Sequence, residues 1–184
     1  MATGCGNVKP REISPQERTV QGLPPSNAVD ERFGITGEPL TPENPDINLP
    51  ASLRSAEWLA FKVRNVGKHV FAVDPGSVEL GTDGIVRYSL LIRTTGGVDN
   101  ITREGIRCAT NTWKIYAVGR ETGEWSRLRE PVWRPIVAAG LNAVRYTLRQ
   151  DYVCDRDNVP FRNAQTVAAR IRASNAGRLD MTSR

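Results

Sequence analysis

Apolar and polar residues alternate with a period of two along most of the segment from residue 58 to residue 127, as they do in β-strands. In the clearest strand the apolar face carries Val86, Tyr88, Leu90 and Ile92 and the polar face Arg87, Ser89 and Arg93. This alternation predicts an antiparallel strand with one buried and one solvated face. The same pattern predicts strands over 58–65, 69–74, 77–80, 101–108 and 113–117, and a short one around Trp125.

Glycine- and proline-containing turns separate these strands. They lie at 65–67, 75–76, 81–84, 96–97 and 120–123, and Asp83-Gly84 is a strong hairpin signal. Successive strands joined by such short turns pair with their neighbours and run antiparallel. The order predicts a β-meander.

The apolar period changes after Pro131 and Pro135. Val137, Leu141, Val144 and Leu148 recur at helical spacing, which predicts a helix over 136–150. A second helix is predicted to open at Pro160 and to end at 175–177, with Ala164, Val167, Ala168 and Ile171 inward and Arg162, Arg170 and Arg172 outward. The predicted fold class is α+β, with the antiparallel meander covered by two C-terminal helices.

Residues 1–50 contain 8 of the 12 prolines and few apolar residues. Because proline lacks a backbone donor and biases its predecessor away from helix, an irregular Pro-rich arm or tether is predicted here. We therefore divide the chain into this arm, an α+β domain over 51–175 and a C-terminal tail over 176–184. A short helix or turn is expected where the domain begins, before the first strand.

The positive charge lies in the domain, because residues 58–184 carry 20 basic and 12 acidic side chains. Such a surface attracts nucleic acid, anionic lipid or acidic protein. The charges are dispersed along the chain, which favours a solvated surface over a nucleic-acid site. A nucleic-acid-binding module remains the alternative, and it requires a contiguous arginine stripe with exposed aromatic residues. No apolar run approaches the ~18–20 residues of a membrane span.

Catalytic and metal-binding patterns are weak. His69 is the only histidine, and a dyad with Cys108 or a serine lacks a nucleophile-elbow motif around any serine. Turn positions account for Asp74 and Asp83, and a cross-strand ion pair accounts for Glu104. Neither C-x-x-C nor H-x-x-x-H spacing occurs. We expect no enzyme activity, no metal site and no cofactor.

The most suggestive residues are aromatic side chains and arginines of the kind that anchor protein interfaces. The candidate interface set is Arg107, Trp113, Tyr116, Arg120, Trp125, Trp133 and Arg134. The same residue types also fill the cores of small β-rich domains, with arginine stacked on aromatics at the rim. The sequence leaves both interpretations open.

Three cysteines are present, at positions 5, 108 and 154. Cys108 and Cys154 are compatible with two buried thiols or with a disulfide, depending on the compartment. The run Ala2–Cys5 is similar to the small-residue end of a lipoprotein cleavage box, so Cys5 is a candidate lipid anchor. Only four residues precede it.

Seven separated motifs occur in an order that resembles the cryptic neisserial protein-like family, a proteobacterial domain of unknown function found in exported and lipid-anchored proteins. They are Phe71–Ser77, Asp83–Tyr88, Glu104–Cys108, Lys114–Arg120, Gly123–Trp125, Trp133–Ile136 and Asp151–Cys154. The resemblance covers about residues 58–172 and leaves the arm outside. It implies a periplasmic or outer-membrane-associated envelope protein that carries an export signal, and it supplies no activity.

For an exported domain, a Cys108–Cys154 disulfide is expected. The leading hypothesis is then a non-enzymatic envelope protein, a binding or accessory subunit. We expect its partner to be an envelope protein or a larger membrane assembly, with the arm as a peripheral membrane tether, and we expect no nucleic acid. The oligomeric state stays open.

Overall fold

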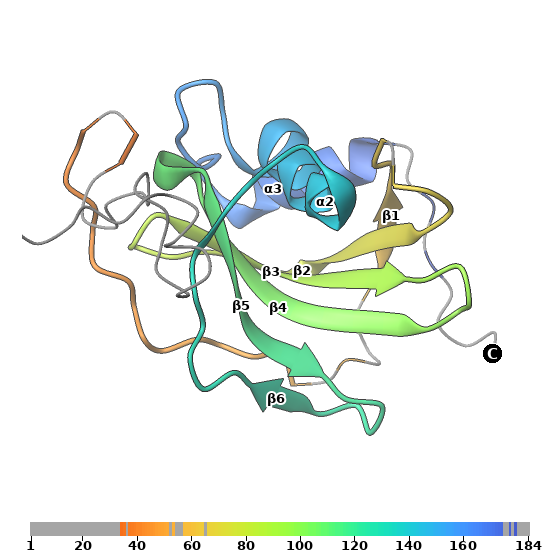
Figure 1. Cartoon of the computed structure of the whole chain (residues 1–184). Helices are drawn as coiled ribbons and strands as arrows, with labels where there is room; N and C mark the ends of the chain where they lie inside the picture. The colour runs from red at the N-terminus through yellow and green to blue at the C-terminus, as the bar shows by residue number, and fades with distance from the viewer. Residues whose placement is uncertain are drawn as a thin grey trace, which may run out of the picture. The chain divides into compact units, whose positions relative to one another are not determined.

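The computed structural model describes residues 34, 35, 37–51, 53, 57–64, 66–174, 177 and 179. In this part of the chain an antiparallel sheet follows chain order from β1 to β6 (Figure 1). The strands are β1 (Leu59–Phe61), β2 (Val70–Leu80), β3 (Ile85–Arg93), β4 (Asp99–Arg107), β5 (Thr112–Gly119) and β6 (Trp125–Arg127). A two-residue strand, β7 (Arg134–Pro135), pairs with the start of β5. The predicted α+β fold with an antiparallel meander is confirmed.

The hairpin turns lie where the glycines predicted them. Gly84, Gly97 and Gly123 have φ of 70°, 82° and 90°, in the left-handed region that side chains other than glycine rarely adopt. Each closes a tight connection, since the amides of Gly84, Gly97 and Gly123 donate to the carbonyls three residues earlier. These turns hold successive strands side by side.

The expected turn at Pro75-Gly76 is wrong, because β2 runs without a break from Val70 to Leu80. Its register against β3 shifts between Asp74 and Glu79, which identifies a β-bulge. Asp74 stabilises the bulge by accepting a hydrogen bond from the amide of Gly76. The proline and glycine therefore bend one strand instead of separating two.

The expectation that β3 has one solvated face is also wrong. Seven of its nine residues are buried, and they include residues on both faces of the strand. Arg87 and Ser89, on the face expected to be solvated, are only 4% and 2% exposed. The sequence pattern marked them as polar, but other parts of the chain cover them. The sheet is buried on both faces.

Two helical segments cover one face of this sheet (Figure 1). The first consists of η2 (Gly140–Asn142), α2 (Ala143–Thr147) and the π-helical turn η3 (Leu148–Val153). It begins about four residues later than predicted, because Ile136 is still bonded to Asn111 beside β5 and Gly140 has a positive φ of 53°. Val144 and Leu148 are buried as expected, whereas Val137 and Leu141 are exposed.

The second helix is α3 (Ala164–Ala173), capped by the side chain of Asn163, which accepts from the amide of Thr166. Its predicted inward residues Val167, Ala168 and Ile171 are buried. Pro160 does not open it and instead forms a bridge with Cys154. The large apolar core lies between these helices and the sheet.

Residues 37–50, which we call the strap, cover the opposite face (Figure 1). Their backbone carbonyls accept hydrogen bonds from side chains of the sheet: Arg103 donates to Asn48 (3.1 Å), Arg127 to Ile47 (2.9 Å) and Trp125 to Pro50 (3.0 Å). The strap is most of the described part of the predicted arm, and it is packed on the domain. We call the sheet surface beneath it the strap face.

A disulfide joins Cys108, which follows β4, to Cys154, which follows η3, with 5.8 Å between their Cα atoms. It fastens the end of the first helical segment to the sheet, as expected for an exported protein. Cys5 and much of the segment expected to form a short helix before β1 lie outside the described residues.

Replacing both cysteines by alanine, C108A/C154A, is expected to lower the free energy of unfolding by about 4 kcal/mol, since the bond closes a loop of 46 residues in the unfolded chain. Urea denaturation measures this change. A reductant should destabilise the wild-type protein by a similar amount and leave the double variant unaffected. Equal stability of the two oxidised proteins would contradict the prediction.

Candidate functional site

Five side chains on the strap face form an alternating row of cations and aromatic rings. Arg107 and Lys114 lie over the ring of Trp133, at 5.1 and 4.6 Å from its centroid, and Lys114 and Arg87 lie over Tyr116, at 5.3 and 5.5 Å. Cations are attracted to the negative faces of aromatic rings at these distances. We call this row the stack.

The strands place these residues together by register. Arg87 in β3 lies opposite Gly105 in β4, and Gly105 lies opposite Lys114 in β5. A side chain on Gly105 would have its Cβ 2.8 Å from the ring of Tyr116, so glycine leaves the space that the ring occupies. The missing side chain lets Tyr116 lie across the middle strand.

Two carboxylates neutralise two of the three cations. Asp83 forms a buried ion pair with Arg87 (2.5 Å), and Glu43 of the strap accepts from Lys114 Nζ (2.6 Å) and from Trp133 Nε1 (3.2 Å). Arg107 is only 6% exposed and has no carboxylate partner among the described residues. The stack therefore keeps one uncompensated positive charge.

The stack perturbs the ionisation of its neighbours. Burial raises the pKa of Tyr116, and the Glu43 carboxylate adds to this rise. Burial opposes the change at Asp83, but hydrogen bonds from Arg87 and from the amides of Asn44 and Ile85 lower the pKa of its carboxyl. Asp83 is thus held as an anion and Tyr116 as a neutral phenol.

A pocket of about 360 Å³ opens beside the stack, between the strap and β5–β6. Its walls are Glu43, Pro45 and Ile47 on one side and Lys114, Tyr116 and Arg127 on the other, with Leu128 and Pro131 at the rim. Lys114 and Tyr116 contribute to its wall although they are only 8% and 4% exposed.

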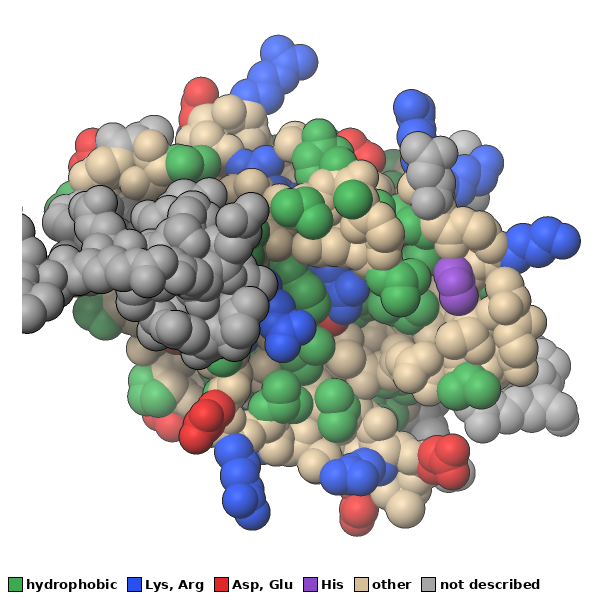
Figure 2. Space-filling view, viewed as in Figure 1, with side chains coloured by type: hydrophobic (Ala, Val, Ile, Leu, Met, Phe, Trp, Pro, Cys, Tyr) green, Lys and Arg blue, Asp and Glu red, His purple; other side chains and the backbone are tan. Residues whose placement is uncertain are grey.

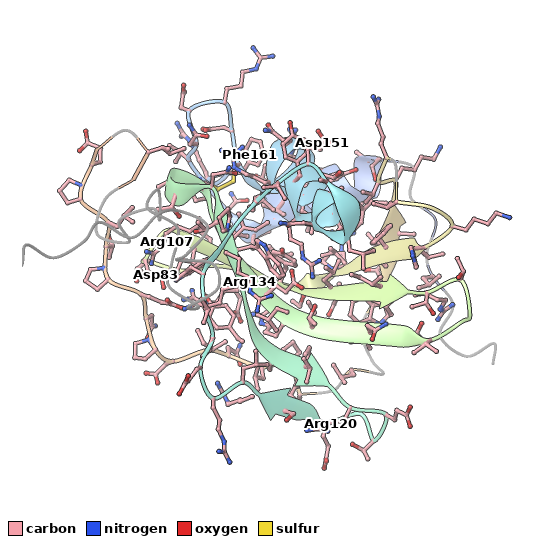
Figure 3. All side chains as sticks on the ribbon, viewed as in Figure 1. Asp83, Arg107, Arg120, Arg134, Asp151 and Phe161 are labelled. Carbon is pink, nitrogen blue, oxygen red and sulfur yellow. A yellow bond between two sulfur atoms is a disulfide. The ribbon has the colours of Figure 1, made fainter. Side chains whose placement is uncertain are left out.

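The predicted interface set is divided among three places. Arg107, Tyr116 and Trp133 belong to the stack. Trp113 lies on the face of the sheet that the helices cover, which we call the helix face, and the guanidinium groups of Arg145 and Arg134 lie 4.1 and 5.9 Å from its ring centroid. Arg120 and Trp125 lie at the β5–β6 hairpin. Figure 3 shows Arg107 near Asp83 at one end of the sheet and Arg120 at the tip of this hairpin. Arg87, Lys114 and Glu43 were missed as site residues; the only sequence signals were a strand glycine at 105 and a lone acid between Pro42 and Pro45.

The helix face contains a buried ion pair. Glu104 accepts from Arg145 of α2 through both carboxylate oxygens, and also from Tyr88 and Thr102. The cross-strand pairing expected for Glu104 is therefore wrong, because its partner comes from a helix. Glu104 is fully buried, and burial together with this carboxylate raises the pKa of Tyr88.

The residues considered for catalysis are not assembled into a site. Cys108 is bonded to Cys154, so its sulfur is not available as a nucleophile. His69 packs edge-on against Phe71, at 6.3 Å between ring centroids. Within the described ranges, no three histidine, cysteine or acidic side chains lie close enough together to hold a metal ion.

Exposed apolar side chains gather in one segment. Among the described residues, five of the eight exposed large hydrophobic side chains lie between positions 128 and 146: Leu128, Val132, Val137, Leu141 and Tyr146. Arg127, Arg129 and Arg134 are exposed along the same stretch. On the face drawn in Figure 2, hydrophobic and basic side chains lie next to one another. We call residues 128–146 the apolar strip.

In a comparison with protein families, the model of the CNP1-like family matches residues 41–172. The chain belongs to the CNP1-like family. The matched region begins inside the strap, so the expectation that the arm lies wholly outside the resemblance is wrong. Residues 41–50 of the strap are thus part of the region that this CNP1-like chain shares with its family.

One curated relative is Cryptic neisserial protein 1 from Neisseria gonorrhoeae (strain ATCC 700825 / FA 1090). It is 32% identical over 92 residues, which cover 43% of this CNP1-like chain and 45% of the relative. The similarity therefore spans about half of that protein's length. No solved structure matches. The disulfide indicates an oxidising, extracytoplasmic compartment, and no helix in the described part of the chain is long and apolar enough to cross a membrane.

Glu104→Gln should cost about 3–5 kcal/mol of stability, because it leaves the buried guanidinium of Arg145 without a counter-ion. Urea denaturation at neutral pH measures the loss. Arg172→Gln is the control, since Arg172 and Glu57 form an exposed pair whose loss should cost under about 1 kcal/mol. Equal losses in the two variants would contradict a special role for the buried pair.

The substitutions Asp74→Asn and Asp83→Asn should change the free energy of unfolding in opposite directions relative to the wild-type protein. Both differences should grow as pH rises. Burial raises the pKa of Asp74, so the wild-type fold loses stability as pH rises through that value, and the neutral asparagine escapes this loss. Asp83 has a lowered pKa and stabilises the fold above its unfolded value, so its replacement is most harmful at neutral pH.

Urea denaturation at pH 3 and pH 7 tests this pair of variants. D74N should gain stability relative to wild type between the two pH values, and D83N should lose it. A shift of the same sign in both variants would show that the local environments do not control these carboxyls.

Proposed function

We propose that this CNP1-like protein is a non-enzymatic binding or accessory subunit of the cell envelope, in the periplasm or at the outer membrane. The proposal rests on the apolar strip, which exposes five large hydrophobic side chains within 19 residues of chain. Exposed large hydrophobic side chains are candidates for contact with another protein when several of them occur in one segment. The disulfide supports the compartment, and lipidation of Cys5 would supply a peripheral tether.

The partner that fits this surface is an envelope protein with an apolar patch and an acidic rim. Arg127, Arg129 and Arg134 lie along the strip with their side chains exposed, so complementary carboxylates would steer the encounter. Trp133 fixes the middle of the strip to the domain, because its indole is held in the stack and donates to Glu43. A fixed backbone lowers the entropy lost on binding.

The alternative of a nucleic-acid-binding module has less support. Five arginines of the basic domain are buried, namely Arg87, Arg103, Arg107, Arg145 and Arg149. They pair with protein groups or lie beneath the strap and helices, so they do not extend a phosphate-binding surface. The proposal of a non-enzymatic role is supported in the same way by the disulfide at Cys108 and by the packing of His69.

The double variant V137D/L141D tests the strip. Both side chains are about half exposed, so the substitutions should leave the fold intact while placing two charges in the contact. Affinity capture from the native envelope fraction should recover a partner with the wild-type protein. We expect the purified partner to bind the variant at least about tenfold more weakly, a change of about 1.4 kcal/mol.

Val159→Asp is the matched control, because Val159 is 52% exposed and lies outside the strip. It should retain the partner at wild-type affinity. Full binding by V137D/L141D, or an equal loss in V159D, would refute the strip as the contact surface. Circular dichroism and urea denaturation check that all three proteins are folded.

A further inference from the structure

The stack contains buried hydrogen-bond donors that no described residue satisfies. Arg107 Nε, Arg107 Nη2 and Arg87 Nε have no hydrogen-bond partner. Guanidinium nitrogens donate and cannot accept, so the unmet demand of this cluster is for acceptor atoms. Buried donors without acceptors are costly, which makes such a one-sided cluster a feature to be explained.

The charge balance points to the same end of the stack. Arg87 is paired with Asp83 and Lys114 with Glu43, whereas Arg107 has no carboxylate within the described residues. The only described interaction of its guanidinium is with the ring of Trp133 at 5.1 Å, and the residue is 6% exposed. A stacked ring does not neutralise a buried guanidinium, because a desolvated charge needs a counter-ion.

The contacts of Glu43 show that the stack can bind a carboxylate group. One oxygen of its carboxylate receives hydrogen bonds from both Lys114 Nζ and Trp133 Nε1. Arg107 lies over the ring of the same tryptophan, so a carboxylate already occupies one place beside this indole. The pocket of about 360 Å³ reaches Lys114 and Tyr116 beside it.

We propose that the Arg107 end of the stack is a binding site for an oxyanion, that is, a carboxylate or phosphate group. The guanidinium of Arg107 would donate through Nε and Nη2, an arrangement that suits two oxygens of one planar or tetrahedral anion. Trp133, whose ring lies against Arg107, would hold the guanidinium in place. This site shares Trp133 with the apolar strip, but anion binding goes beyond the proposed partner-binding role.

Isothermal titration calorimetry of the full chain tests the site with sodium phosphate and with sodium succinate, at constant ionic strength set by sodium chloride. The wild-type protein should bind at least one of the two anions at a single site. Arg107→Gln should weaken that binding at least tenfold. Arg107→Lys keeps the charge but replaces the two-nitrogen fork of the guanidinium by one ammonium nitrogen, so its affinity should lie between those of the other two proteins.

Arg120→Gln is the matched control, because Arg120 is an exposed arginine at the β5–β6 hairpin whose side chain bonds only to Ser126 among the described residues. It should bind the anion as the wild-type protein does. Thermal unfolding with and without the anion gives an independent readout, since a ligand of the native state raises the melting temperature. The rise should be absent or small in R107Q.

Vesicles of phosphatidylglycerol distinguish a phosphate carried by a lipid from a free ion. Binding to vesicles that is lost in R107Q assigns the site to a headgroup, whereas binding of free anions alone assigns it to a soluble ligand. The proposal is overturned if the wild-type protein binds neither anion, or if R107Q binds as tightly as R120Q. Should R107Q fail to fold, the wild-type and R107K titrations decide the question.

Discussion

A sheet buried on both faces that carries arginines on one of them needs acceptors on that side, and much of the domain follows from this requirement. The strap meets it with backbone carbonyls for Arg103 and Arg127 and with the carboxylate of Glu43 for Lys114. A proline-rich segment suits the task, because proline removes amide donors from the backbone while keeping every carbonyl. The strap therefore supplies hydrogen-bond acceptors to a sheet surface that is rich in donors.

The opposite face is held in a different way. There the apolar core excludes water, and two specific connections join β4 to the first helical segment: the Glu104–Arg145 pair and the Cys108–Cys154 bond. One connection lies at the middle of β4 and the other just beyond its end. Together they fix both the position of α2–η3 and its direction along the sheet, which apolar packing alone specifies weakly.

The sequence alone predicted the features that depend on residues close together in the chain. Strand alternation, the glycines at 84, 97 and 123, and the apolar spacing of α3 predicted elements that the structure contains. The sequence did not predict contacts between residues that are far apart in the chain. Arg87 was expected to face solvent, because the strap that covers it lies more than forty positions earlier. Glu104 was expected to pair across the sheet, but its partner Arg145 comes from a helix. Arg107, Tyr116 and Trp133 were singled out from residue type, but their assembly with Glu43 depends on a β4 glycine and on the path of the strap.

The strap also orders events during synthesis. Its contacts reach forward to Lys114, Trp125, Arg127 and Trp133, which are 71 to 90 positions later in the chain. A chain that emerges from its N-terminus first therefore exposes the strap long before its binding surface exists. The hydrogen bonds of the strap with Lys114, Trp125 and Arg127 can form only after β5 and β6 have been made.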